Sequence, residues 1–193
     1  MVAMDLATQL LSSMLRKSFD NLRWLLEDVD EADCFWEPAE GCWSVRRRED
    51  AGRAWGTGDW VCEDAWPPPD PLPVTTIAWR LAHLAAWTDV YRSFAFETHG
   101  LDLSEFDVPG TRDELVSWLC AAQDRLGAKV DALDDADLVE LRAAYFGPPR
   151  PLHRLVSTMV VEHMHHGAEI GLLRDLRRGH ARLQPPPVND APK

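Results

Sequence analysis

Apolar residues near the start of the chain recur at intervals of three and four, which is the spacing of one buried helix face. Leu22, Leu25 and Leu26 belong to this stripe, which extends over residues 5–29. Asp5 stands at its beginning, and a carboxylate there can accept hydrogen bonds from the amides of a first helical turn. The pattern predicts an amphipathic helix over 5–29 that begins at an Asp5 cap.

Two further stretches repeat this pattern in the middle of the chain. The first covers residues 75–100, begins at a threonine whose hydroxyl can cap a helix, and ends at a glycine. The second covers residues 111–133 and opens with Thr111 and Glu114, which have the spacing of a capping box. Both are predicted to be helices, and residues 134–141 are predicted to add a short helical turn.

A fourth helix is predicted over residues 151–178. It begins at Pro151, whose fixed φ suits a first turn, and stops before Gly179. Polar side chains interrupt its apolar stripe, which reads Leu155, Met159, Glu162, His166, Ile170 and Leu173. Residues 182–193 are rich in proline and polar residues and are predicted to be a disordered tail.

The helical pattern is lost between the first two helices, over residues 31–73. This segment is crowded with glycine, proline and five tryptophans, namely Trp36, Trp43, Trp55, Trp60 and Trp66. Long connections in compact domains are usually functional, and indole rings bury large areas. We therefore expect an ordered loop that packs against the helices and either covers one end of them or lines a pocket.

Four amphipathic helices and no alternating strand pattern predict an all-α fold, a four-helix bundle with a long tryptophan-rich loop between helices one and two. The length of 193 residues suits one hydrophobic core. We expect a single domain over residues 1–181, with strands nowhere in it.

Charge and composition exclude some classes of function. The formal net charge of -12 opposes binding to the phosphate backbone of nucleic acids. No apolar stretch approaches the roughly 18 residues that a membrane span needs, and the N-terminus does not read as a secretion signal. We expect a cytoplasmic protein whose four cysteines are reduced thiols.

One constellation carries candidate chemistry. Glu162 and His166 are four residues apart, which places them on one helix face, and His83 lies among apolar residues of the helix over 75–100. An ordinary Glu–His hydrogen bond would also explain the pair. Burying two imidazoles and a carboxylate is costly, however, and a divalent cation would compensate it. Three protein ligands leave coordination positions open, as in catalytic metal sites.

Two other histidines compete with His166 as the ligand on this helix. The spacing places His163 on a helix flank, about a hundred degrees from Glu162. His165 lies on another edge, where it can bond Glu169 one turn on. His166 fits the centre of the stripe best, so the predicted ligands are His83, Glu162 and His166.

The segments WRLAHLAAW and VVEHMHHGAEIGLLRDL together resemble the DinB-like superfamily of metal-binding four-helix bundles, which includes mycothiol-dependent maleylpyruvate isomerases. The likeness extends over most of the chain. In that superfamily one ligand comes from the second helix and two from the last, which by position are His83, Glu162 and His166. The resemblance implies a zinc ion, with nickel, iron, cobalt or manganese as alternatives, and a homodimer.

The resemblance also implies a function, a metal-dependent transferase or isomerase that acts with a low-molecular-weight thiol such as mycothiol on a small-molecule substrate. Arg80 and Arg174 are candidates for holding an anionic substrate or cofactor, although both also suit ordinary surface or helix-end roles. The alternatives are a metal-dependent hydrolase and a binding or stress-response protein that the ion stabilises without turnover.

Overall fold

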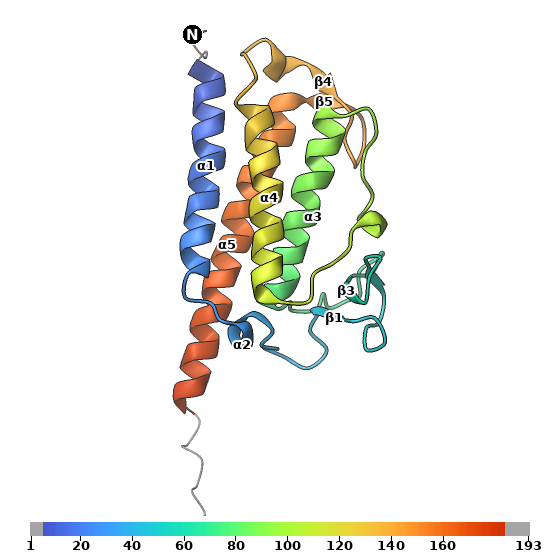
Figure 1. Cartoon of the computed structure of the whole chain (residues 1–193), viewed down its shortest axis with the longest axis vertical. Coiled ribbons are helices and arrows are strands. Elements are labelled where there is room, and N and C mark those ends of the chain that lie inside the picture. The colour runs from blue at the N-terminus through green and yellow to red at the C-terminus, as the bar shows by residue number, and fades with distance from the viewer. Residues whose placement is uncertain (1–5, 184–193) are drawn as a thin grey trace, which may run out of the picture.

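Four long helices lie side by side in the computed structural model, which describes residues 6–183 (Figure 1). They are α1 (Leu6–Leu26), α3 (Ile77–Phe96), α4 (Arg112–Val130) and α5 (Leu152–Leu183). α3 packs against α4 and α5, and α1 packs against α5 and α4. A mostly helical fold is thus confirmed, and none of the described helices is long and apolar enough to cross a membrane.

Hydroxyl caps begin two of these helices as the sequence predicts. The Thr76 hydroxyl accepts a hydrogen bond from the amide of Trp79 at 3.2 Å, and Thr111 accepts one from the amide of Glu114 at 3.4 Å. The Thr111 hydroxyl also donates to the Glu114 carboxylate at 2.8 Å, a variant of the predicted capping box. The predicted cap at Asp5 lies outside the described residues.

The ends of all four helices differ from the prediction: α1 ends at Leu26 instead of residue 29 and α4 at Val130 instead of residue 133. α3 ends at Phe96 instead of Gly100, and α5 continues through Gly179 to Leu183. A Cβ at Gly179 would meet no atom within 4 Å, so this glycine sits on an open helix surface and only lowers helix propensity. The predicted tail over 182–193 begins inside α5, and the rest of it lies outside the described residues.

The segment over 31–73 contains secondary structure that was not predicted. It carries α2 (Glu31–Cys34) and the strands β1 (Val45–Arg47), β2 (Ala54–Trp55) and β3 (Trp60–Glu63). The strands form an antiparallel sheet in the order β1-β3-β2. The expectation of no strands is therefore wrong, because strands of two to four residues are too short to show an alternating pattern.

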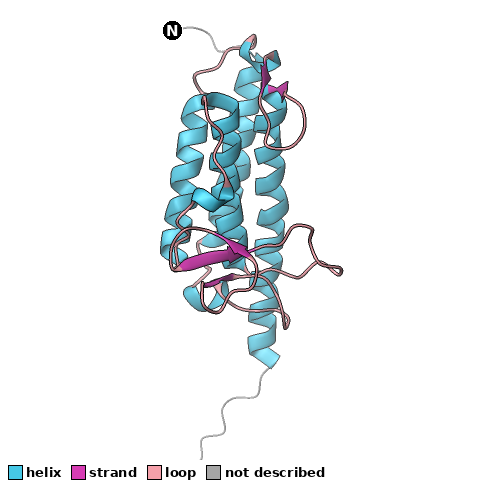
Figure 2. Ribbon diagram, turned by 90° about the vertical axis from the view of Figure 1, so that its right-hand side faces the viewer, coloured by secondary structure: helices cyan, strands magenta, loops and turns pink. Residues whose placement is uncertain are grey.

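This sheet lies at the end of the helices where α3 begins (Figures 1 and 2). Backbone hydrogen bonds join the two, since Trp43 donates to Val74 and accepts from Thr76, each at 2.9 Å. Four of the five loop tryptophans pack partly buried against the core, whereas Trp66 is 82% exposed. The sheet covers the end of the helices and fixes the start of α3.

A hairpin lies at the opposite end of the helices (Figures 1 and 2). It consists of the antiparallel strands β4 (Leu141–Arg142) and β5 (Arg150–Pro151), the latter directly before α5. A single 3₁₀ turn, η2 (Asp137–Val139), confirms the short helical turn predicted over 134–141. A second 3₁₀ turn, η1 (Leu103–Glu105), lies between α3 and α4.

Gly167 and Gly171 of α5 face α1 at distances that would leave a Cβ in ordinary contact. A Cβ at Gly167 would lie 3.7 Å from Leu22 Cδ1, and one at Gly171 would lie 3.4 Å from Leu25 Cδ2. α5 also packs against α3, so it buries two of its faces instead of one. That arrangement decides where its histidines point.

Candidate metal centre

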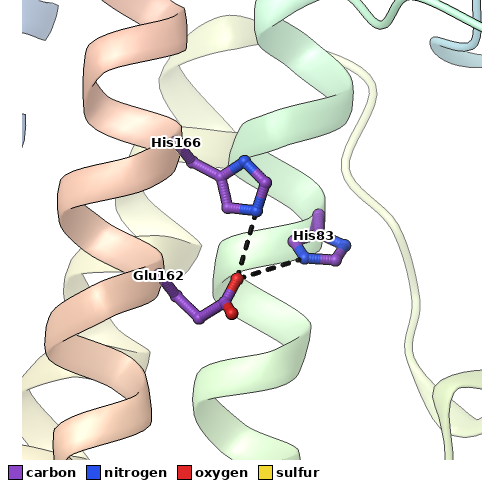
Figure 3. Close-up of side chains that lie close together, drawn as sticks. All are labelled: His83, Glu162 and His166. Carbon is purple, nitrogen blue, oxygen red and sulfur yellow. Dashed lines mark ion pairs between the residues drawn. The ribbon is translucent and has the colours of Figure 1, made fainter.

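His83, Glu162 and His166 meet between α3 and α5 (Figure 3). Glu162 Oε2 lies 3.8 Å from His83 Nε2 and 3.2 Å from His166 Nε2. The two imidazole rings are 4.8 Å apart between centroids and steeply inclined. Three candidate donor atoms of types N, N and O thus face one point, as the spacing of the sequence predicts.

The helical repeat of α5 positions two of these side chains. Glu162 and His166 follow each other by one turn, and Met159 and Ile170, one turn before and after them, are fully buried. The polar pair therefore interrupts an apolar stripe that packs inward. The His166 side chain is only 9% exposed, whereas those of Glu162 and His83 are 28% and 22% exposed. The group is consequently open to water on the side of His83 and Glu162.

An indole ring fixes the orientation of His83. The His83 ring stacks on Trp79, one turn earlier on α3, at a centroid distance of 4.7 Å. Trp79 Nε1 donates a hydrogen bond of 2.6 Å to the carbonyl of Glu63 on β3, and Trp43 stacks on the Trp79 ring at 6.3 Å. The tryptophan-rich segment therefore reaches the candidate centre through Trp79 and has more than a covering role.

His166 faces a carboxylate at each ring nitrogen. Its Nδ1 lies 2.7 Å from Glu169 Oε2, while its Nε2 faces Glu162. Carboxylate oxygens only accept hydrogen bonds, and a neutral imidazole carries one N–H. With the proton on Nδ1, the lone pair of Nε2 points at Glu162, and this second contact then needs either a second proton or a cation between the two atoms.

Glu169 is itself held in place by Arg80. The Arg80 guanidinium pairs with Glu169 Oε2, and the same nitrogen lies 2.9 Å from His166 Nδ1. When Nδ1 carries the proton, Glu169 Oε2 accepts from both Nδ1 and Arg80; in the other tautomer Nδ1 accepts from Arg80 and Nε2–H donates to Glu162. Burial lowers the pKa of Arg80, which Glu169 partly offsets. A carboxylate behind a histidine in this way is the usual support of a metal ligand.

The electrostatics of the group follow from its packing. The neighbouring His166 and His83 rings hold the pKa of Glu162 well below its ordinary value, so this carboxylate is ionised at neutral pH. Burial lowers the pKa of His83, with Glu162 acting in the opposite direction. An ionised carboxylate beside an imidazole with a lowered pKa is favourable for binding a divalent cation.

The distances suit an ion as well. Tetrahedral ligands that each lie about 2.1 Å from zinc are about 3.4 Å from one another. The observed separations of 3.2 Å and 3.8 Å bracket this value. The donor set and its geometry thus fit one divalent ion.

A second group of candidate ligands shares His166. It consists of His165, His166 and Glu169, all within two turns of α5. His165 Nε2 lies 3.3 Å from Glu169 Oε1, the contact predicted from their spacing, but its side chain is 63% exposed. Because the Glu169 carboxylate already pairs with the Arg80 cation, this group is less suited to a divalent ion than the group on two helices.

The structure corrects the prediction for His163, which is fully buried instead of lying on a flank. Its ring faces α1, where Ser18 Oγ lies 3.3 Å from Nδ1 and Phe19 packs at a centroid distance of 5.5 Å. Nε2 is buried with no hydrogen-bond partner, and burial lowers the pKa of His163 to about 4. His163 is a core residue on the second buried face of α5.

Both arginines that the sequence suggests for binding an anion contact other groups of the protein. Arg174 donates to the carbonyl of Leu25 at the end of α1 and to Asp175, which is a helix-end role. Arg80 supports Glu169. Sequence reasoning considered Glu169 only as a partner of His165, although its spacing of three from His166 was the signal for the contact that the structure shows.

Comparisons with known proteins agree with this architecture. A family model described as the DinB superfamily matches residues 14–170. The crystal structure of a conserved protein from Enterococcus faecalis superposes with a TM-score of 0.58, covering 92% of this chain and 99% of that one. The two sequences are 16% identical, so this likeness shows the fold alone. No curated protein matches the sequence.

Proposed function

This chain belongs to the DinB superfamily, and on that premise we propose that it holds one divalent metal ion between His83, Glu162 and His166. The observation that carries the proposal is the position of His166 between two carboxylates. Glu169 can accept a hydrogen bond from one ring nitrogen of His166. An ion would bind the other ring nitrogen and the ionised Glu162 carboxylate. The four long helices would then serve as the bundle that holds the site.

Two imidazoles and a carboxylate favour zinc, and the same set also suits nickel, iron(II), cobalt and manganese. Three protein ligands leave coordination positions open. Because His83 and Glu162 are partly exposed, these positions would be reachable from water. That favours catalysis over a purely structural ion.

The proposed reaction is a transferase or isomerase reaction that uses a low-molecular-weight thiol such as mycothiol. A divalent ion at this site would lower the pKa of a coordinating thiol, so that its thiolate exists at neutral pH. The thiolate sulfur would then bond to an electrophilic carbon of a small substrate, and the thiol proton would pass to water. In a transfer the bond from that carbon to a leaving group would break, and the group would depart with the electron pair. In an isomerisation the π electrons at that carbon would move onto the substrate and return when the thiolate leaves. His83, Glu162 and His166 would hold the ion, and Glu169 with Arg80 would keep His166 oriented. A homodimer and a cytoplasmic location remain parts of the proposal.

A titration with mycothiol and its S-methyl derivative tests this function. The purified protein is loaded with zinc, and the binding of each compound is measured by calorimetry. The thiol is expected to bind and release a proton, which changes the measured heat with the ionisation enthalpy of the buffer. The S-methyl derivative cannot form a thiolate, so we expect it to bind more weakly and without proton release.

Matched variants separate the metal from the thiol in this experiment. His83→Ala should abolish thiol binding, whereas His165→Ala should leave it unchanged, because His165 lies outside the proposed ligand set. Equal binding of the thiol and its S-methyl derivative by the zinc-loaded protein would exclude thiol activation. An ion that binds tightly without either compound binding would instead favour a structural role.

A further inference from the structure

A row of aromatic rings leads from the candidate metal ligand His83 to the protein surface. Trp87 lies one turn after His83 on α3, at a centroid distance of 6.1 Å. Around Trp87 stand Tyr91 at 5.9 Å, Tyr145 at 5.0 Å and Phe146 at 5.6 Å. We call Trp87, Tyr91, Tyr145 and Phe146 the aromatic lip.

The lip joins two segments that are distant in the sequence. Trp87 and Tyr91 continue the face of α3 that carries His83, with steps of one turn. Tyr145 and Phe146 come from the loop of the β4–β5 hairpin. The lip therefore borders the candidate centre at His83.

The hairpin holds its two rings in fixed places. Gly147 turns the chain directly after Phe146 with a φ of +79°, which favours glycine. The Tyr145 hydroxyl donates to Asp102 at 3.3 Å, and the Tyr145 ring packs edge-on against Phe94. The lip is thus anchored through Tyr145 on one side and α3 on the other.

Phe146 is more exposed than the other three residues of the lip. It contacts Trp87 and Tyr145, with a centroid distance of 4.7 Å to the latter, yet 56% of the residue is exposed. Its exposed part continues the aromatic surface that begins at His83, and aromatic rings bind one another at these distances in tilted or edge-on arrangements.

We infer that the aromatic lip binds a flat aryl group of a substrate whose donor atoms reach the ion at His83, Glu162 and His166. The inference rests on the proposed metal site and names the substrate class that the site would take. None of the four lip side chains carries a formal charge at neutral pH, and the faces of aromatic rings are electron-rich, so they favour a neutral ring over an anionic group. The aryl-bearing partner would be the electrophile that the thiol attacks.

Two hydroxamates of different size test the inference by binding alone. Acetohydroxamate and benzohydroxamate chelate a metal ion through the same two oxygens, and only the second carries an aryl ring. The affinity of the zinc-loaded protein for each is measured by calorimetry, and their ratio defines the aryl preference. Comparing this ratio between variants removes the intrinsic difference between the two chelators.

Phe146→Ala is expected to reduce the aryl preference by about two- to tenfold, the range that one aromatic pair contributes. Phe146→Leu should fall between it and the wild type, since leucine keeps apolar surface without a ring. Leu141→Ala is the matched control, because Leu141 is exposed in the same hairpin and belongs to no ring contact of the lip. It should leave the preference unchanged. Circular dichroism of each variant verifies its fold.

Three results would overturn the inference. The first is an aryl preference that is unchanged in both Phe146 variants, and the second is an equal fall of this preference in Leu141→Ala. The third is an equal loss of affinity for both hydroxamates in Phe146→Ala, which would show that the Phe146 ring has a structural role. Metal analysis of the same samples distinguishes a failure of the proposed function from a failure of this inference. A wild-type protein that binds no zinc disproves the metal site, whereas a zinc-loaded protein without aryl preference disproves the lip alone.

Discussion

His166 makes the most informative contacts of any single residue, because a carboxylate faces each of its ring nitrogens. The Glu162 side follows from a spacing of four on one helix and could be predicted. The Glu169 side has a spacing of three on the same helix, but Arg80, which holds Glu169, comes from another helix, and periodicity does not report that contact. The sequence therefore predicts which side chains meet better than it predicts what orients them.

Glu169→Gln tests the orienting role. The amide can still pack in the same space but no longer provides an anionic acceptor for His166 Nδ1 and Arg80. Loss of such a support typically lowers metal affinity by roughly 10- to 100-fold. Competition with a fluorescent zinc chelator measures the change. His165→Ala is the control, since His165 contacts Glu169 from the exposed side, and a fall in affinity there would favour the group of His165, His166 and Glu169.

Because His163 is buried, we expect the free energy of unfolding to depend on pH. Burial lowers its pKa from 6.5 to about 4, so between these values the unfolded chain binds more protons than the folded one. The free energy of unfolding should therefore fall as pH falls through this window, by at most about 1.4 kcal/mol per pH unit for one group. Above pH 6.5 both states are neutral at this residue and the contribution is complete.

Urea unfolding of the chelator-treated protein at several pH values measures this effect. His163→Leu should flatten the dependence, although part of it should remain because the pKa of His83 is also lowered. His165→Leu is the exposed control and should behave as the wild type. An equally steep dependence in His163→Leu would show that other groups cause it.

At the scale of elements, α5 explains both a success and a failure of the sequence prediction. Its inward stripe was predicted correctly, including Glu162 and His166. Its second buried face was missed, because one hydrophobic period describes a helix that packs on one side only. Gly167 and Gly171 lie on this second face, but a Cβ at either would make only ordinary contact with α1, so they do not by themselves reveal it.

Gly167→Ala tests how closely α1 and α5 pack. A Cβ there would make ordinary contact with Leu22, and alanine favours a helix by roughly 1 kcal/mol over glycine. We expect the free energy of unfolding to rise by up to about this amount. Gly147→Ala should lower it, because the hairpin glycine has a positive φ. A decrease for Gly167→Ala in urea unfolding would mean that the helices have no room for a methyl group.

At the scale of the whole molecule, the helices were predictable, whereas the short strands in the segments that connect them were not. The four long helices have enough turns to show their period and their caps. The sheet over 31–73 has strands of two to four residues, and its pairing is set by contacts with α3 that no local pattern reveals. The aromatic lip was missed for the same reason, because it joins α3 to a hairpin far along the chain.

Metal analysis of the purified protein tests the central claim most directly. Wild type and His165→Ala are each expected to carry one divalent ion per chain, whereas His83→Ala and His166→Ala should lose it. Circular dichroism shows whether each variant remains folded, so that a lost ion reports the ligand and not the fold. Equal metal content in wild type and in folded His83→Ala would contradict a site that joins α3 to α5.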